Sequence, residues 1–592
     1  MSEKYSKRKG KECSPASTII KIEEILRKLG IIVIQEWNHA LSNHYSVNLR
    51  IAGTNLYSNG KGTSMEYTLA SAYAEMMERL QTMALFRFHS QYMDEVMEYG
   101  GYTYTPDELK ISISDIALEK DNYYDVFSSE RMTEDTAKKW MEIENVQYLS
   151  KKKLDYITMV PFKDITTGDK VYFPIKMVDL INGSNGMCAG NTYEEAMVQG
   201  ISELCERYVN KVIIQQRITP PEINIEYIKE HCKTSYSMIT SIKRRGYDVI
   251  VKDCSLGKGF PVVACIIINK KLGRFFVKFG AQPNMDIAIE RCLTETFQGR
   301  NLDKIDWFRD YFYSYDDEFE AINLSNILHS GDGFYPYEFF MNKEDYSFKS
   351  WNYEEDDNVK LKDKLVNLII DSGYKLFVRD WSFLGFPTYQ IVSPSLSNIY
   401  DSLEERVNWH KDYAEVKDYC KRLAEINDEE FVRIIDFMKR NRYTNNQGII
   451  NIVGIPVDLN GKWSKLKKDY FIALYNYKKG KYEEAYTAIN NYVNTNNNVV
   501  FRCLRHFILL RYLNKNEEEI VIELSKLYSE NIVFYVRNIL EKESSFENYN
   551  VKCSNCNNCK EECYQKGINN LLKVLKKEYI KSFNKQKSKQ SI

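Results

Sequence analysis

Three apolar stretches of this chain carry the same short polar pattern, and that repetition restricts how the chain can fold. In each stretch a polar residue is followed four positions later by Glu, and three positions after that by Glu or Gln. Steps of four and three place side chains above one another on one face of an α-helix. Carboxylates on otherwise apolar helices need partners, so we expect the three polar faces to converge. The stripe residues are Ser71, Glu75 and Glu78 with Arg79; Gln199, Glu203 and Glu206 with Arg207; and Arg291, Glu295 and Gln298.

The residues before each stripe predict where its helix begins. The first predicted helix covers residues 63–86, with a capping box of Thr63 and Glu66 after a turn at Asn59–Gly62. The second follows a glycine-containing turn and a capping box of Thr192 and Glu195. The third covers residues 286–300. Each stripe is therefore expected within a regular helix.

A pocket that gathers five glutamates needs positive charge. At an effective dielectric near 20, like charges about 4 Å apart repel by roughly 4 kcal/mol per pair. Mg2+ meets this need, since it binds a few carboxylates together with substrate phosphates. Arginines and helix N-termini add donors for anions. One pair of glutamates on a helix lies more often on a solvated surface than in a binding site. Three matching stripes, however, favour a nucleoside-triphosphate pocket.

At these residues the sequence resembles the YcaO family. The resemblance rests on NGKGTS with LASAYAEMMERL, on SNGMCAGNT with EAMVQGISELCERYV, on ERCLTETFQGR preceded by FGAQP, and on IVSPSLSNIY. These motifs keep the family's order over about residues 10–420. Members of the family bind ATP and Mg2+ without a Walker loop, and many phosphorylate a backbone amide oxygen so that a nucleophile can replace it. The resemblance therefore implies an ATP-dependent enzyme that activates amides.

The resemblance also assigns individual residues. The implied Mg2+ ligands, which form the catalytic group, are Glu75, Glu78, Glu203, Glu206 and Glu295. The implied nucleotide contacts are Lys11, Thr18, Ser71, Arg79, Asn191, Gln199, Arg207 and Arg291.

Composition and charge indicate an ordinary soluble globular protein. The 592 residues suffice for two or three domains, 44% of them are hydrophobic, and the net charge is −1. This balance shows no bias toward DNA or a membrane. Apolar runs stay short of the ~18 residues of a membrane span, and the polar start lacks a signal core, so we expect a cytoplasmic protein.

The distribution of strand-like and helix-like segments predicts two domains. Strand-like runs alternate with helices up to residue 400, which predicts an α/β domain over residues 1–415 that binds ATP and Mg2+. Residues 171–178 are one predicted strand, and VVACIII at 262–268 lacks alternation, so it should be buried on both faces. Residues 416–592 predict an all-helical domain. Within it, residues 470–493 resemble a tetratricopeptide-type hairpin that turns at Gly480, although an ordinary helical bundle fits equally well.

The end of the chain carries a cysteine cluster and a basic tail. Cys553, Cys556, Cys559 and Cys563 have the spacing C-x2-C-x2-C-x3-C, which in a cytoplasmic protein favours a metal over disulfides. Bacterial ferredoxins use this spacing for iron–sulfur clusters, but a second set and a following Pro are missing here, so Zn2+ is the alternative. After Leu572 the tail has seven Lys and one Glu, which suits RNA, an acidic partner or simple solubility.

The C-terminus and the exact sequences of the motifs distinguish between classes of the family. Members that form azolines usually end in a proline-rich tail that enters the active site, whereas this chain has no Pro after Pro456. The wording of SNGMCAGNT and ERCLTETFQGR is closest to an enterobacterial member, an accessory factor for β-methylthiolation of a ribosomal protein. The resemblance thus implies an ATP-hydrolysing accessory factor, often a homodimer in this family, with a ribosomal protein or a methylthiotransferase as partner. Thioamide or azoline formation on a peptide backbone is the alternative, and a non-catalytic nucleotide-binding scaffold is the third.

Overall fold

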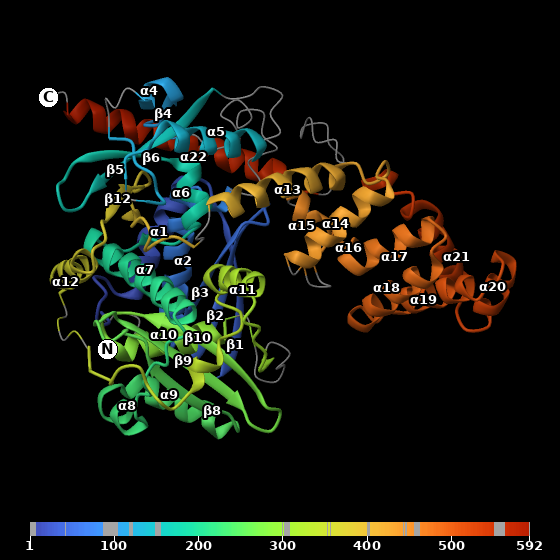
Figure 1. Ribbon diagram of the computed structural model, residues 1–592, viewed down its shortest axis with the longest axis horizontal. Helices are drawn as coiled ribbons and strands as arrows, with labels where there is room; N and C mark the ends of the chain where they lie inside the picture. The colour runs from blue at the N-terminus through green and yellow to red at the C-terminus, as the bar shows by residue number, and fades with distance from the viewer. Residues whose placement is uncertain are drawn as a thin grey trace.

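The computed structural model shows a larger lobe that contains three β-sheets and a smaller helical lobe that extends to one side (Figure 1). It describes residues 7–590 except for 42, 87–104, 118–121, 129, 148–154, 299, 301–307, 352, 354, 356, 400–402, 442, 444–446, 455–461 and 550–562.

The first sheet is three-stranded and carries the first stripe helix on one face. Its strands are β1 (Val33–Leu41), β2 (His44–Ile51) and β3 (Tyr57–Gly62), all antiparallel. Helices α2 (Met65–Gln81) and α1 (Pro15–Lys28) pack together beside it, and η2 (Ala84–Phe86) follows α2. A Cβ atom on Gly60 would lie 2.2 Å from the carbonyl oxygen of Thr68, so only glycine lets α2 approach β3 this closely.

Two predictions about the start of α2 are wrong. Residues 59–62, predicted as a turn, are the last four residues of β3, because they pair with β2. Since the strand continues to Gly62, Thr63 is needed to turn the chain. The helix therefore begins after Ser64, whose hydroxyl group accepts a hydrogen bond from the N–H of Tyr67 at 3.3 Å. The predicted cap at Thr63 is replaced by this one.

The two larger sheets form the rest of the larger lobe. One has the strand order β4-β5-β12-β13-β7, with β6 paired to β5, and the other has the order β11-β10-β9-β8. Their bounds are β4 (Leu109–Ser112), β5 (Tyr156–Asp164), β6 (Lys170–Pro174), β7 (Met187–Ala189), β8 (Asp248–Asp253), β9 (Val262–Asn269), β10 (Arg274–Ala281), β11 (Arg309–Asp310), β12 (Phe377–Asp380) and β13 (Thr388–Val392). The first six residues of β9 are buried, as predicted. The predicted strand 171–178 is wrong in its second half, because the chain turns at Pro174 into helix α6.

Helix α7 (Tyr193–Gln215) connects the two larger sheets, since it contacts β7 and β13 on one side and β9 and β10 on the other. The third stripe helix, α10 (Met285–Thr296), packs on β9 and β10. It is shorter than predicted, so Gln298 follows the helix. The other helices of this lobe are α4 (Ile113–Ala117), α5 (Glu134–Gln147), α6 (Ile175–Asn182), α8 (Ile225–His231), α9 (Lys233–Arg244), α11 (Asp317–Ser330), η4 (Tyr337–Phe340) and α12 (Asn358–Asp371).

The smaller lobe is helical and has its own hydrophobic core. Helices α17 and α18 form the predicted hairpin, and Gly480 between them has a φ of +73°. The mixed sheets and helices followed by a helical C-terminal region confirm the predicted fold class, while the tetratricopeptide likeness stays a prediction. The elements are α13 (Leu403–Lys421), α14 (Asp428–Arg440), α15 (Ile449–Val453), α16 (Lys462–Lys465), α17 (Lys468–Lys478), α18 (Tyr482–Thr495), α19 (Val499–Tyr512), α20 (Glu517–Ser525), α21 (Glu530–Asn538), η5 (Ile539–Glu543) and η6 (Glu547–Tyr549).

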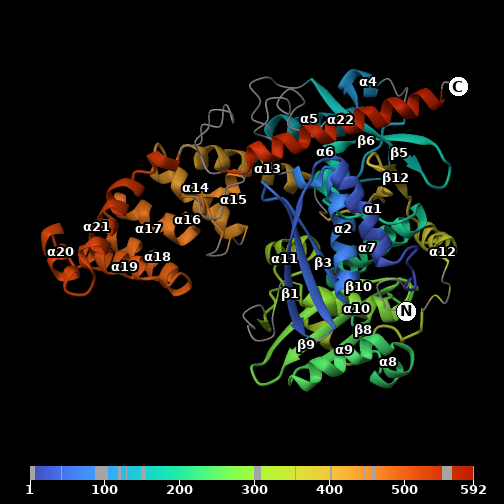
Figure 2. The ribbon, with the colours of Figure 1, turned by 180° about the vertical axis from the view of Figure 1, so that it is seen from behind.

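The last helix, α22 (Gln565–Gln590), returns to the larger lobe (Figure 2). Ile568 and Leu575 belong to the same core as α1 and α2, and Tyr579 stacks on Phe383 with ring centroids 4.4 Å apart. The division at residue 415 stays a prediction of domain organisation. In packing terms, the core of the larger lobe uses residues from both sides of that boundary.

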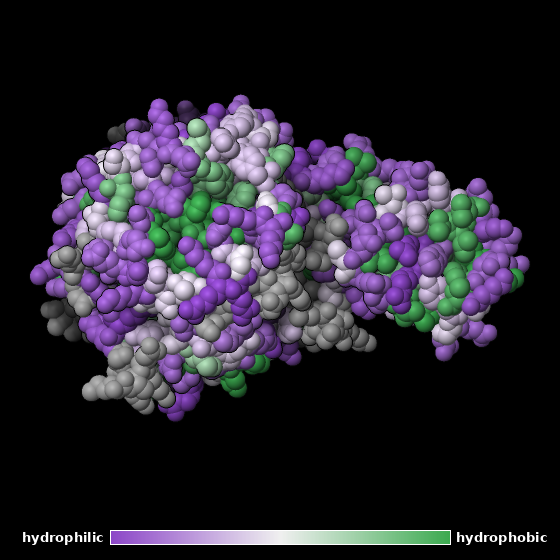
Figure 3. All heavy atoms as spheres, turned by 90° about the horizontal axis from the view of Figure 1, so that it is seen from below, coloured by the Kyte–Doolittle hydropathy of each residue, from purple (hydrophilic) through white to green (hydrophobic). Residues whose placement is uncertain are grey.

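The face drawn in Figure 3 is largely hydrophilic, with hydrophobic side chains gathered in patches on both lobes. Exposed apolar residues of the smaller lobe include Ile522, Leu527 and Phe534. Over the ranges that the structure describes, none of the helices combines the length and the apolar character needed to cross a membrane.

Candidate functional site

A cavity of about 450 Å³ lies where α2, α7 and α10 meet, and the three polar stripes line it. All residues that the family resemblance assigns to Mg2+ or nucleotide face this cavity, and Gln298 lies there too. From α2 come Ser71, Glu75, Glu78 and Arg79; from α7 and the residues before it, Asn191, Gln199, Glu203, Glu206 and Arg207; from α10, Arg291 and Glu295; and from the N-terminal segment, Lys11 and Thr18.

Arginines of the cavity pair with some of its glutamates. Arg79 Nε lies 3.5 Å from Glu78 Oε1 and 3.9 Å from an oxygen of Glu75. Arg207 Nη2 lies 3.1 Å from Glu203 Oε1. These arginines supply part of the positive charge that the five carboxylates need, and Mg2+ as the source of more stays a prediction. Among the described residues, no three His, Cys, Asp or Glu side chains are gathered closely enough to hold a metal ion as they stand.

Lys61 and Lys278 supply further positive charge next to Glu295. Lys61 forms an ion pair with Glu295 Oε1, and Lys278 Nζ lies 3.7 Å from Glu295 Oε2. Lys61 is on β3 and Lys278 on β10. Sequence reasoning assigned neither of them, because the stripe pattern describes helices and these lysines come from strands. Only Lys61 gave a signal, as part of the quoted motif NGKGTS.

The environment divides the carboxyl groups of the cavity into two kinds. Burial raises the pKa of Glu78 to about 8, against the opposing effect of Arg79 and with help from the charge of Glu203. Burial also raises the pKa of Glu75, and burial together with the charge of Glu295 raises that of Glu206. At Glu295 burial alone would raise the pKa, but Lys61, Lys278 and Arg291 outweigh it and lower it. Glu295 is thus a permanent anion, whereas Glu78 readily keeps a proton.

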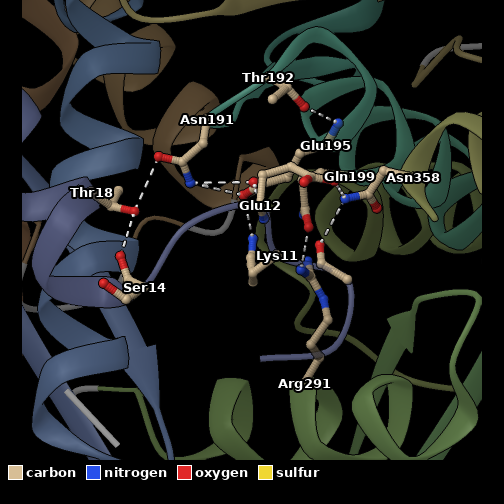
Figure 4. A network of polar contacts seen from close by, with 11 residues as sticks. Lys11, Glu12, Ser14, Thr18, Asn191, Thr192, Glu195, Gln199, Arg291 and Asn358 are labelled. Atoms are coloured by element: carbon tan, nitrogen blue, oxygen red, sulfur yellow. Dashed lines mark hydrogen bonds and ion pairs between the residues drawn. The ribbon is translucent and has the colours of Figure 1, made fainter. Parts of the chain in front are cut away.

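The N-terminal segment lines part of the cavity and is held there by contacts with α7 (Figure 4). Lys11 Nζ lies 3.2 Å from Glu195 Oε1, and the backbone N–H of Glu12 donates to Glu195 Oε2 at 2.9 Å. Thr18 Oγ1 donates to Asn191 Oδ1 at 3.1 Å. Burial alone would raise the pKa of Glu195, but Lys11, the Glu12 N–H and Asn191 outweigh it and lower the pKa.

Glu195 therefore has a different role from the one predicted. Its backbone N–H does donate to the cap residue Thr192 at 3.2 Å, but its carboxylate binds the N-terminal segment instead of completing a capping box. A second ion pair strengthens the same attachment, since Arg8 Nη1 donates to Glu290 Oε1 at 2.7 Å. Asn358 Nδ2 of α12 donates to Glu12 Oε1 at 2.6 Å. Sequence reasoning missed Arg8, Glu195 and Glu290 as cavity residues, because their partners are distant in the chain.

The cavity fits a nucleotide with Mg2+ in size and chemistry. Its volume lies within the roughly 300–1,000 Å³ of ligand pockets. Eight basic side chains and seven glutamates line it, which suits both a polyanion and a hard cation. Arg291 Nη1 donates to Gln199 Oε1 at 2.8 Å, while the buried Arg291 Nε has no hydrogen-bond partner in the part of the chain that is described. That guanidinium keeps a donor for a ligand.

The predicted cysteine cluster cannot be placed in the same way. Cys553, Cys556 and Cys559 lie outside the described residues, and Cys563 is partly buried. Zn2+ or iron–sulfur binding there stays a prediction.

Comparison with known proteins decides the family. A family model described as YcaO cyclodehydratase, ATP- and Mg2+-binding, matches residues 59–397, which is more than half of the chain. The chain belongs to the YcaO family. The model of the YcaO cyclodehydratase C-terminal domain matches residues 414–564. The ATP and Mg2+ in the family's description agree with the donors of the cavity.

Relatives of this YcaO protein match along most of its length. It is 25% identical over 519 residues to the ribosomal protein S12 methylthiotransferase accessory factor YcaO of Escherichia coli (strain K12), covering 85% of this chain and 86% of that protein. It is 27% identical over 512 residues to an uncharacterised protein of Haemophilus influenzae, covering 83% of each. Among solved structures, YcaO from Methanopyrus kandleri bound with AMPPCP and Mg2+ matches with a TM-score of 0.42 and 18% identity, covering 66% of this chain and 93% of that chain. A heterocyclase in complex with substrate and cofactor matches with a TM-score of 0.45 and 17% identity, covering 67% and 54%.

Proposed function

We propose that this YcaO protein hydrolyses ATP with Mg2+ in the cavity between α2, α7 and α10 by phosphorylating a backbone amide, as an accessory factor for ribosomal protein β-methylthiolation. The observation that carries the proposal is the convergence of the three stripes, with all five glutamates intact, on one cavity that also holds arginines and lysines. The printed name of the Escherichia coli relative supports the accessory role. A ribosomal protein or its methylthiotransferase is then the partner.

In this proposal, one group of cavity residues binds Mg2+ and another binds the nucleotide. Glu75, Glu78, Glu203, Glu206 and Glu295 are the residues that would hold Mg2+. The nucleotide contacts would be Lys11, Thr18, Ser71, Arg79, Asn191, Gln199, Arg207 and Arg291. When bound, ATP with Mg2+ supplies the phosphoryl group for the amide oxygen.

Phosphoryl transfer depends mainly on positioning and on charge stabilisation, and the chain offers both. The contact between Arg291 and Gln199 fixes the α10 guanidinium relative to α7. Arg207 is held between Glu203 and the backbone carbonyl of Leu328, so its charge has a defined position. The N-terminal segment lines part of the cavity and is fixed to α7 through Glu195, so its donors also have a defined position.

Two alternatives rest on the same cavity. Thioamide or azoline formation on a peptide backbone uses the same amide activation, and the family description as a cyclodehydratase favours it as the second candidate. A nucleotide-binding scaffold without catalysis is less well supported, because a scaffold has no need to keep every glutamate. Assembly as a homodimer and a cytoplasmic location remain predictions.

A deletion strain tests the proposed role. The methylthiolated aspartate of the small-subunit ribosomal protein should be lost or strongly reduced in the deletion strain, as measured by mass spectrometry of the intact protein and its peptides. Re-expression of the wild-type gene should restore it, and re-expression of a Glu206→Gln variant should not. Undiminished methylthiolation would refute the accessory role. Loss of a peptide thioamide in its place would establish the alternative.

A further inference from the structure

Three cations surround one carboxylate at the inner wall of the cavity. Lys61 and Lys278 approach Glu295 from β3 and β10, one at each carboxylate oxygen. Arg291, one helical turn before Glu295, adds a third positive charge that acts on the same group. The side chains of Lys278 and Glu295 are only 14% and 15% exposed. Glu206, whose charge acts on Glu295 and Arg291, is the second carboxylate here, so three cations face two carboxylates and the wall has a local surplus of positive charge.

Gly331 places the end of α11 directly against the Lys278 ammonium group. A Cβ atom on Gly331 would lie 2.1 Å from Lys278 Nζ, so any larger residue would displace the ammonium group. Gly331 ends α11 with a φ of +67°, and its N–H donates to the carbonyl oxygen of Ile327 at 2.7 Å. The C-terminus of a helix carries partial negative charge, which stabilises a nearby cation. The end of α11 thus positions Lys278 against the cavity.

Lys61 owes its direction to the geometry of β3. Gly60 and Gly62 face α2 closely, and side chains alternate along a strand, so Lys61 points the other way, toward α10. Both lysines therefore reach the cavity from rigid strands. Groups carried on strands and helices are placed more reproducibly than groups on loops, which favours a binding role.

We propose that Lys61 and Lys278 bind the phosphates of the nucleotide, and that they leave Glu295 to Mg2+ when the nucleotide and metal bind. The proposal rests on the proposed function of the cavity. In the structure the two ammonium groups and a metal ion would compete for the same carboxylate. Once a divalent cation occupies Glu295, the lysines are repelled from it, and phosphate oxygens are the anions within their reach. An ammonium group on a flexible stem suits such a change of partner.

This exchange predicts opposite effects on the two ligands. Lys61→Met and Lys278→Met each remove a competitor of Mg2+, so Mg2+ alone should bind about three- to tenfold more tightly than to the wild-type protein. A non-hydrolysable ATP analogue at saturating Mg2+ should bind about tenfold more weakly, since a charge-assisted phosphate contact is lost. Adenosine, which has no phosphates, should bind with unchanged affinity. All three can be measured by calorimetry on the full chain.

The controls separate a binding role from a structural one. Lys270→Met removes an exposed lysine whose ion pair with Asp248 spans 2.7 Å in the same sheet as Lys278, and it should change neither affinity. Lys61→Arg and Lys278→Arg keep the charge and should retain most of the analogue affinity, which also covers the case in which a methionine variant fails to fold.

Two results would overturn the lysine proposal alone. The first is that both methionine variants bind the analogue with the same affinity as the wild-type protein. The second is a parallel weakening of Mg2+ and analogue in folded variants, which would mean that the ion pair with Glu295 is only structural. If the wild-type protein bound no ATP analogue at all, the proposed function and the lysine proposal would both be refuted.

Discussion

Arg291 Nη1 donates a hydrogen bond of 2.8 Å to Gln199 Oε1, and this contact joins the polar stripes of α10 and α7 inside the cavity. The two residues are far apart in sequence, and each lies at the beginning of its own stripe. The Nε–H of Arg291, which has no hydrogen-bond partner among the described residues, then remains available to a ligand.

Arg291→Ala should weaken ATP binding at least tenfold, because it removes a charged donor from the nucleotide site. The cost in folding stability should be about 1.5–3 kcal/mol, as expected for one hydrogen bond that involves a charged group. Calorimetry and thermal unfolding measure the two effects. Arg274→Ala is the matched control, since its ion pair with Asp310 is exposed and outside the cavity. Equal effects of the two changes on ATP affinity would contradict the assignment.

Glu195→Gln should speed up the dissociation of ATP. The carboxylate accepts the N–H of Glu12 and pairs with Lys11, so the change loosens the N-terminal segment that lines the cavity. We expect a three- to tenfold higher dissociation rate in stopped-flow measurements with a fluorescent ATP analogue, from a charge interaction worth about 1 kcal/mol. Glu226→Gln, on the surface of α8, is the control. An unchanged dissociation rate in Glu195→Gln would show that the segment does not retain the nucleotide.

The raised pKa of Glu78 predicts that the stability of the folded protein depends on pH. Its pKa is raised to about 8, so the folded protein keeps a proton that the unfolded chain releases near pH 4. Its contribution to stability is therefore present below about pH 4 and is lost as the pH rises to about 8. Glu78→Gln should then raise the melting temperature at pH 8–9 in the absence of Mg2+ and have little effect near pH 4.

The same group should release a proton when Mg2+ binds. Calorimetry at pH 7 in two buffers of different ionisation enthalpy should show proton release in the wild-type protein and a smaller release in Glu78→Gln. The same release in both proteins would mean that Glu78 is ionised before the metal binds.

The spacing of the C-terminal cysteines predicts that they bind a metal. Elemental analysis of protein purified without oxygen should find about one Zn2+ per chain, or iron with acid-labile sulfide. A variant with Ser at Cys553, Cys556, Cys559 and Cys563 should lose it. Metal content far below one per chain, and unaffected by the four changes, would leave these residues without a metal role.

The sequence was most informative where one helix carried the whole signal. The stripes on α2, α7 and α10 could be predicted because a spacing of four and three depends only on the helical repeat. Their meeting in one cavity followed from the cost of leaving carboxylates unpaired on apolar helices.

The sequence was less informative where a partner comes from another element. Lys61 and Lys278 reach Glu295 from two sheets, and Glu195 binds a segment 183 residues earlier, so no local pattern contained these contacts. The turn expected at residues 59–62 was wrong for a related reason. Its glycines allow the close contact between β3 and α2. In the sequence, glycines needed for such tertiary packing look the same as glycines needed for a turn.

Calorimetric titration of ATP with Mg2+ into the wild-type, Glu206→Gln and Arg207→Ala proteins tests the central claim most directly. Both side chains line the cavity, one from the carboxylate set and one from the cationic set. We expect measurable binding to the wild-type protein and to Arg274→Ala, and no detectable binding to either cavity variant, while circular dichroism shows the same fold in all four. Wild-type affinity for ATP in both Glu206→Gln and Arg207→Ala would show that the cavity is not the nucleotide site.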